Sequence, residues 1–299
     1  MALQYAGGTT VNNTSVVNDK AALIAAINTA LTGAGWTITT TTSSTDHVYR
    51  SALTPQNNQI KLRVWDGGAN CVRLRMMNTA QTIAQANSCF LYVTTSTTYT
   101  LIANQYQFWF FVPGSASSRN FCMGSALYIP PHLVAMGLTT CAMIQGNGNS
   151  DTDTSNSTGS FRTALTARGF ASANPAQGWT ILNATAVEYD GLTYDVYPHP
   201  GLPAIATIQS SAIDDISGYR WHDDSALVTE PLVSWGAPTM DSEGKLRGQL
   251  WDSFISTEAY TADITTVFDS HNYYNITESN NGEVTLPATM RGSVFVVVP

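Results

Sequence analysis

Charged residues are scarce in this chain. Asp, Glu, Lys and Arg together make up 11% of its 299 residues, whereas soluble domains carry about 25%. The formal net charge is −8, and binding to DNA or RNA needs a cationic face, so we expect no nucleic-acid partner. A surface with few charges is suited to packing against neighbouring molecules, because every buried charge must be paired or lose its hydration energy.

Long apolar runs and closely paired cysteines are also missing. No segment approaches the roughly 18 apolar residues of a membrane span, and residues 1–10 lack the basic start and apolar centre of a signal peptide. We therefore expect neither membrane insertion nor a cleaved leader. No C-x-x-C pair occurs, which argues against zinc. We expect reduced, buried thiols, with disulfides as the alternative, at Cys71, Cys89, Cys122 and Cys141.

Motifs of the common enzyme classes are absent as well. The sequence contains no GxSxG, no Walker-type phosphate loop and no GxGxxG after a strand. The Trp221–Asp224 cluster, WHDD, could ligate a metal or form an acid–base pair, but adjacent residues of a strand point to opposite faces. We therefore expect that this chain is not an enzyme, with no catalytic residue and no cofactor.

One acidic loop is a weak candidate for a metal site. Asp151 and Asp153 alternate with polar residues, as at the start of a calcium loop. Asn156 stands where such a loop needs glycine, and Arg162 stands where it needs a bidentate glutamate. A solvated polar loop is the simpler interpretation.

The spacing of apolar residues predicts one N-terminal helix and many strands. Leu23, Ile24, Ile27 and Leu31 share one face of an amphipathic helix over about 19–32. Residues 246–256 are the second plausible helix. Alternating or short apolar runs predict strands at 36–42, 59–65, 71–76, 90–93, 99–102, 107–112, 126–129, 180–182, 186–189, 204–209 and 226–233. The expected fold class is α+β, predominantly antiparallel β and sandwich-like, with the N-terminal amphipathic helix.

A polar, low-complexity stretch suggests a division of the chain. Residues 145–160, QGNGNSDTDTSNSTGS, are either an exposed loop or a linker. We place a tentative boundary there, between a helix-plus-β domain at 1–144 and a second β-rich region at 161–299. One continuous domain is the alternative.

Two candidate interfaces follow from the strand patterns. Residues 59–76 predict a hairpin whose outward face gathers Lys61, Arg63, Arg73 and Arg75. Like charges repel across a ladder, so this face is either solvated or meets the carboxylates of a neighbouring subunit. The second candidate is the apolar segment 294–298. A strand of this kind must be covered on both faces and paired at its edge. Its residues are Val294, Phe295, Val296, Val297 and Val298.

The second interface carries an expectation of its own. We expect deletion of residues 293–299 to abolish assembly and leave a soluble fold. The segment 271–275, HNYYN, has the aromatic and amide groups that glycan-binding surfaces use, although interface or core packing is the favoured interpretation of such residues.

The order and style of several segments resemble uncharacterised virion or tail-associated proteins of tailed bacteriophages. The segments are AGWT (34–37), QFWFFVPG (107–114), ALYIPPHL (126–133), SDTDTSNSTGSFRTAL (150–165), YRWHDDSALVTEPLVSWG (219–236), RGQLWDSF (247–254) and MRGSVFVVVP (290–299). The resemblance implies a multi-copy structural protein of the virion, in the tail or baseplate, assembled in the bacterial cytoplasm. Its partners would be copies of itself and other virion proteins. A module that binds host-surface glycan and a capsid decoration protein are the alternatives.

Overall fold

Three antiparallel β-sheets and two helices make up the described part of the chain. The computed structural model describes residues 4–68, 70–77, 88–93, 96–113, 121–135, 137, 140–146, 148–149, 177–182, 186–190, 196–197, 229–236, 245–256, 265–268, 270–275 and 293–299. Every strand pair within these ranges is antiparallel. The expected predominance of antiparallel β structure is therefore confirmed.

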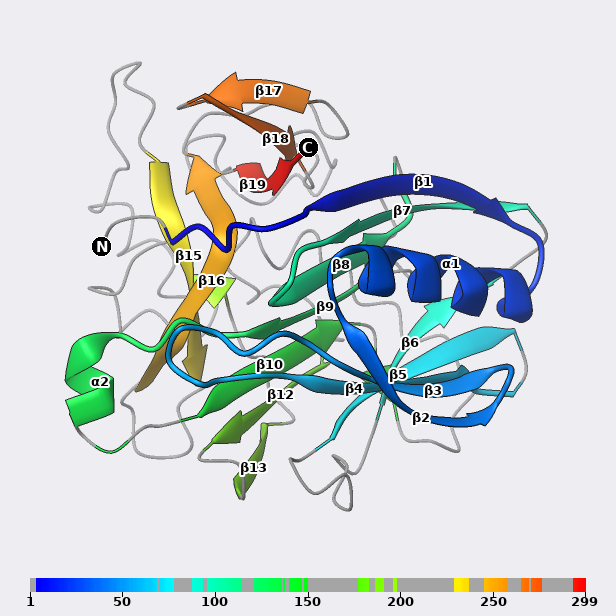
Figure 1. Cartoon of the computed structure of the whole chain (residues 1–299), viewed down its shortest axis with the longest axis horizontal. Helices are drawn as coiled ribbons and strands as arrows, with labels where there is room; N and C mark the ends of the chain where they lie inside the picture. Colours follow the sequence, from blue (N-terminus) through cyan, green and yellow to red (C-terminus); the bar gives the residue numbers. More distant parts are fainter. Residues whose placement is uncertain are drawn as a thin grey trace, which may run out of the picture.

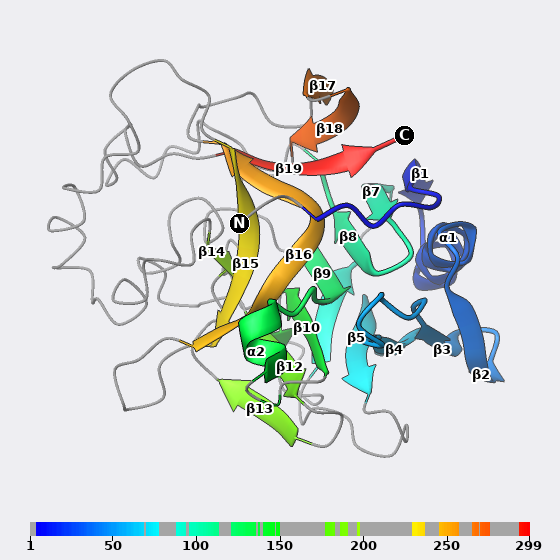
Figure 2. The same cartoon turned by 60° about the vertical axis from the view of Figure 1, so that its left-hand side comes forward.

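Sheet A forms the middle layer, in the strand order β1-β7-β8-β9-β10-β12-β13 (Figures 1 and 2). Pairing of β10 with β12 joins strands from both sides of residues 145–160 into this one sheet. The strands are β1 (Val11–Val17), β7 (Thr97–Ala103), β8 (Gln107–Phe111), β9 (Phe121–Ala126), β10 (Cys141–Gly146), β12 (Gln177–Leu182) and β13 (Ala186–Asp190).

Sheets B and C lie on the two faces of sheet A. Sheet B has the order β11-β6-β5-β4-β3-β2, and sheet C has the order β14-β15-β16-β19-β18-β17. The strands of sheet B are β2 (Thr37–Ser43), β3 (Asp46–Arg50), β4 (Lys61–Asp66), β5 (Cys71–Met77), β6 (Ser88–Tyr92) and β11 (Gly148–Asn149). Those of sheet C are β14 (Val196–Tyr197), β15 (Thr229–Gly236), β16 (Lys245–Ser256), β17 (Thr265–Phe268), β18 (His271–Asn275) and β19 (Ser293–Val298).

Strand β8 explains why sheet A is the middle layer. Successive side chains of a strand point to opposite faces. Phe108 and Phe110 belong to the apolar core between sheets A and B, whereas Trp109 and Phe111 belong to the core between sheets A and C. All four side chains are fully buried. The apolar run at 108–111 is therefore explained by a strand that is covered on both faces.

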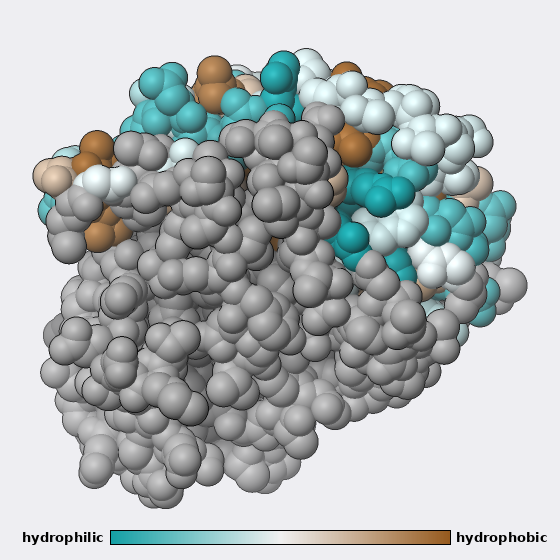
Figure 3. Space-filling model, turned by 90° about the horizontal axis from the view of Figure 1, so that it is seen from below, coloured by the Kyte–Doolittle hydropathy of each residue, from teal (hydrophilic) through white to brown (hydrophobic). Residues whose placement is uncertain are grey.

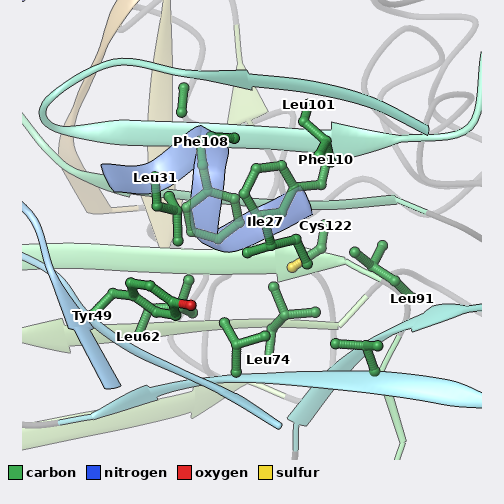
Figure 4. Close-up of a cluster of buried hydrophobic side chains, with 14 of the residues drawn as sticks. Ile27, Leu31, Tyr49, Leu62, Leu74, Leu91, Leu101, Phe108, Phe110 and Cys122 are labelled. Carbon is green, nitrogen blue, oxygen red and sulfur yellow. The ribbon is translucent and has the colours of Figure 1, made fainter. Parts of the chain in front are cut away.

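Helix α1 (Lys20–Gly33) closes the core between sheets A and B (Figure 4). The Asp19 carboxylate caps the helix by accepting a hydrogen bond from the Ala22 backbone N–H at 2.7 Å. The buried side chains come from one face and are Leu23, Ile24, Ile27, Ala30 and Leu31. The opposite face exposes alanine and threonine, at Ala21, Ala25, Thr29 and Thr32. The helix lies where it was expected, but the polar contrast between its two faces is small.

The second expected helix is wrong. Residues 245–256 form β16, a strand of 12 residues that pairs with β15 and β19. Leu250 packs into the core between sheets A and C, while Trp251 packs with Tyr106 on the opposite side. Burial on both faces hides the alternation of a strand, and the remaining apolar spacing imitates a helix. The strand expected at 126–129 is also largely absent, because only Ala126 lies in a strand, at the end of β9. The short helix α2 (Pro131–Ala135) follows this segment.

No helix within the described ranges is both long enough and apolar enough to cross a membrane. The four cysteines are buried and form no disulfide bond, as expected. Burial, together with the neighbouring Cys89 thiol, raises the pKa of the Cys122 thiol, which keeps it protonated and unreactive.

Candidate functional site

The hairpin expected at residues 59–76 is present, with its two faces as the alternation predicts. Strands β4 and β5 pair in register around the turn at 66–70. The inward side chains are Leu62, Val64, Val72, Leu74 and Met76. The outward face carries the four basic residues expected there, Lys61, Arg63, Arg73 and Arg75.

Part of the positive charge on this face is balanced inside the chain. The Arg63 guanidinium donates two hydrogen bonds to the Asp46 carboxylate on the neighbouring strand β3, at 3.0 and 2.7 Å. Arg63 and Arg75 also lie over the Trp65 ring, 4.8 and 5.1 Å from its centroid, which is a favourable cation–π distance. The carboxylate that balances the charge of Arg63 therefore belongs to the same chain and not to a neighbouring subunit.

The other two arginines are less available to a partner than their position suggests. Arg73 is only 2% exposed, and its guanidinium donates to the Ser88 hydroxyl at 2.9 Å. Burial, followed by the charges of Arg63 and Arg73, lowers the pKa of Arg75. An interface role for these four residues stays a prediction.

Strand β19 lies between two other strands of sheet C, whereas the interface role expected for it requires an open edge. It pairs with β16 through residues 293–296 and with β18 through residues 295–298. Val296 and Val298 are buried in the core between sheets A and C. Phe295, paired on both sides, has no free backbone edge. We now expect deletion of residues 293–299 to disrupt sheet C, so the soluble fold first expected for that variant would be lost.

The HNYYN segment forms strand β18 and has little exposed aromatic surface. Tyr273 and Asn275 are fully buried, and Tyr274 packs against the core between sheets A and C. His271 stacks on Tyr5 with ring centroids 4.6 Å apart. The Tyr5 and Tyr273 hydroxyls lie 3.0 Å apart within hydrogen-bonding distance. This strand mainly anchors the N-terminal segment.

A buried carboxylate that no motif of the sequence singles out lies at the centre of that anchor. Asp252 of β16 is 5% exposed and has a φ of +48°, a left-handed conformation that side chains other than those of Asn and Asp rarely adopt. Its carboxylate accepts hydrogen bonds from the Ala6 N–H at 2.8 Å and from the Asn104 side-chain amide at 2.7 Å. Its own N–H donates to the Gln4 carbonyl at 2.8 Å.

Asn104 extends this cluster into sheet A. It lies in the turn between β7 and β8, is 2% exposed, and its side-chain oxygen accepts from the backbone N–H groups of Tyr106 and Gln107 at 2.8 and 2.9 Å. The Trp36 indole N–H donates to the Asn104 carbonyl at 2.8 Å. We call Asp252, Asn104 and Ala6 the Asp252 cluster. Its hydrogen bonds connect three separate parts of the chain, which indicates a structural role.

Burial raises the pKa of Asp252 to about 6, although hydrogen bonds from Ala6 and Asn104, and the nearby His271, act in the opposite direction. The folded chain therefore binds a proton at Asp252 more tightly than the unfolded chain. This group contributes stability that is complete below its ordinary pKa of 3.8 and is lost as the pH rises through about 6. Asp66, whose pKa the Lys20 ammonium lowers, acts in the opposite sense and at lower pH.

We expect the chain to unfold less readily at pH 5 than at pH 8 because of Asp252, by at most about 1.4 kcal/mol, since the pKa of about 6 lies one unit above pH 5. Asp252→Asn keeps the shape and the left-handed backbone but has no proton to bind. Urea unfolding of both proteins at the two pH values measures the effect. The variant should show a smaller difference between pH 5 and pH 8; equal differences in the two proteins would contradict the assignment.

Several sequence candidates lie outside the described residues. They are Asp151, Asp153 and the cluster at 221–224. Within the part that the structure does describe, no group of three or more His, Cys, Asp or Glu side chains could hold a metal ion.

Comparison of the chain with models of known protein families and with curated protein sequences gave no match.

Proposed function

We propose that this chain is a structural component of a tailed-phage virion, a multi-copy protein of the tail or baseplate that assembles with copies of itself. The resemblance of its segments to tail-associated proteins motivates the proposal. A feature of the molecular surface supports it. Residues 1–45 contain only two charged side chains, Asp19 and Lys20, although the whole chain carries a net charge of −8.

Both of these charges are used within the chain. The Asp19 carboxylate caps α1, and the Lys20 ammonium pairs with Asp66 at 2.5 Å. The surface formed by β1, α1 and β2, on the right-hand side of Figure 1, is therefore almost free of unpaired charge. Figure 3, seen from below Figure 1, shows the described residues on its right as white and teal with scattered brown atoms, without one continuous apolar patch.

Such a surface suits contact with a neighbouring molecule. Designed soluble surfaces carry roughly 25–35% charged residues to remain hydrated and to repel other copies. A face with small and hydroxylated side chains has no charge to desolvate when a neighbour covers it. In this proposal α1 keeps its apolar side in the core and offers its alanine- and threonine-rich side to the neighbour. This uncharged face is the observation on which the assembly role rests.

Electron microscopy of the purified chain tests the proposal against its alternative. A particle-building protein should form closed, symmetric assemblies that persist in high salt, because uncharged contacts are not screened. A module that binds host-surface glycan should remain single and be retained by isolated bacterial cells or cell-wall sugars. Retention on cells without any symmetric assembly would contradict the structural role.

A further inference from the structure

Residues 4–6 form a short strap that lies on sheet C, although the chain continues from them into sheet A. Figures 1 and 2 draw this blue segment running from β16 to β1. The Asp252 N–H donates to the Gln4 carbonyl, and the Asp252 carboxylate accepts from the Ala6 N–H, both at 2.8 Å. Asp252 therefore holds the strap through its backbone and through its side chain.

The strap has little apolar surface to keep it in place. Of its three residues only Ala6 is buried, and it packs with Tyr106 and Trp251. Tyr5 remains 37% exposed. A segment with few buried apolar contacts opens at a lower free energy than the core of a fold. The hydrogen bonds to Asp252 are therefore a large part of what holds the strap closed.

Two glycines join the strap to the rest of the chain. Gly7 and Gly8 have φ angles of +64° and +74°, in the left-handed region that most other residues rarely adopt. Both are exposed, and a Cβ atom added at Gly7 would meet nothing within 4 Å. Because glycine changes its dihedral angles at low cost and Gly7 has open space around it, this pair has the properties of a hinge.

We propose that residues 4–6 open and close on the Gly7–Gly8 hinge, and that the Asp252 carboxyl group is a latch that holds them more tightly in acid than at neutral pH. In the closed strap Asp252 is 5% exposed. Opening brings water to the carboxyl group, and an ionised carboxylate gains far more from hydration than a protonated one. Loss of the proton therefore favours the open strap. The device operates in a single chain and does not depend on assembly.

The sign and the size of the effect follow from proton linkage. Burial raises the pKa of Asp252 to about 6 in the closed strap, against an ordinary value of 3.8. Hydration in the open strap returns the pKa toward the ordinary value. The stability that the proton adds to the closed strap is complete below pH 3.8 and is lost as the pH rises through about 6. The ratio of closed to open strap should therefore be up to about tenfold higher at pH 5 than at pH 7.

Within the described residues, two titratable side chains are electrostatically coupled to Asp252. The charge of His271, on β18, lowers the pKa of Asp252 and so opposes the latch. Tyr106 follows β7, and its pKa is raised by burial and then by the Asp252 charge, so its hydroxyl stays protonated from pH 5 to pH 7. His271→Phe removes the imidazole charge and keeps an aromatic ring for the stack on Tyr5. This variant separates the contribution of His271 from that of Asp252.

Hydrogen exchange of the Ala6 N–H, followed by NMR at pH 5 and pH 7, tests the latch. Dividing the exchange rate of an unstructured peptide at each pH by the observed rate gives a protection factor that is free of the pH dependence of exchange itself. This protection factor should be up to about tenfold greater at pH 5. It should be equal at the two pH values in Asp252→Asn, which has no proton to lose, and should remain greater at pH 5 in His271→Phe.

Two controls separate the strap from the fold as a whole. The Phe110 N–H lies in the buried strand β8 and exchanges through global unfolding, so it should be better protected than the Ala6 N–H. Asp66→Asn removes a different carboxylate, which pairs with Lys20, and should leave the Ala6 result unchanged. Equal protection of Ala6 and Phe110 would mean that the strap does not open by itself. A protection factor of Ala6 that is the same at both pH values, or a pH difference that persists in Asp252→Asn, would overturn the latch.

Discussion

Gly124→Val is expected to destabilise the chain by about 3 kcal/mol, toward the upper end of the cost of overpacking a core. A Cβ atom at this position would lie 2.5 and 2.8 Å from two ring carbons of Phe108 and 3.2 Å from Ile60 Cδ1. Phe108 is held in place, because its ring stacks on Phe110 at 4.6 Å and meets the edge of Trp36 at 6.0 Å. Because protein cores are close-packed, displacing this ring costs free energy.

A double-mutant cycle shows whether this contact is the cause. Phe108→Leu removes the ring that the new side chain would strike, so Gly124→Val should cost less in that background than in the unmodified chain. Gly33→Ala is the control, since its new methyl group would meet only the Val11 side chain, at 3.2 Å. Urea unfolding gives the free energies. Additive costs in the double mutant would mean that Phe108 and Gly124 are not packed as described.

Asn104→Ala is the second substitution with a large expected effect. It leaves two buried backbone N–H groups, those of Tyr106 and Gln107, without their acceptor, and it removes a donor from Asp252. Each buried polar group left unsatisfied costs about 1–3 kcal/mol. We therefore expect a loss of about 3–5 kcal/mol in the free energy of unfolding.

Asn104→Asp separates the roles of the two ends of the side chain. One carboxylate oxygen still accepts from Tyr106 and Gln107, while the other faces Asp252, where the amide nitrogen of Asn104 is 2.7 Å away. Two carboxylates at that distance share one proton, which raises one of the two pKa values. The variant should be strongly destabilised at pH 8 and recover much of its stability at pH 5. Asn104→Ala should show no such recovery, and equal pH profiles for the two variants would contradict this geometry.

The sequence predicted the local elements better than their partners. The alternation of residues 59–76 acts over a few residues, and strands β4 and β5 follow it. Strand β16 was mistaken for a helix because Leu250 and Trp251 are buried on opposite faces by segments far away in the chain. The position of β19 between β16 and β18 likewise depends on long-range pairing that its own apolar run does not encode.

The Asp252 cluster could not be found from the sequence for the same reason. Ala6, Asn104 and Asp252 are separated by 98 and 148 positions, and none belongs to a recognisable motif. The low charge of the chain predicts contact with neighbouring molecules, and this stays a prediction. The apolar run at 294–298, expected to be an assembling strand, is the inner strand β19 of sheet C.

The mass of the purified chain in solution, measured by light scattering across a concentration series, tests the central claim of self-assembly most directly. Our account predicts a discrete multiple of 32.1 kDa that is retained on dilution and in high salt. A mass of one chain at every concentration would contradict it.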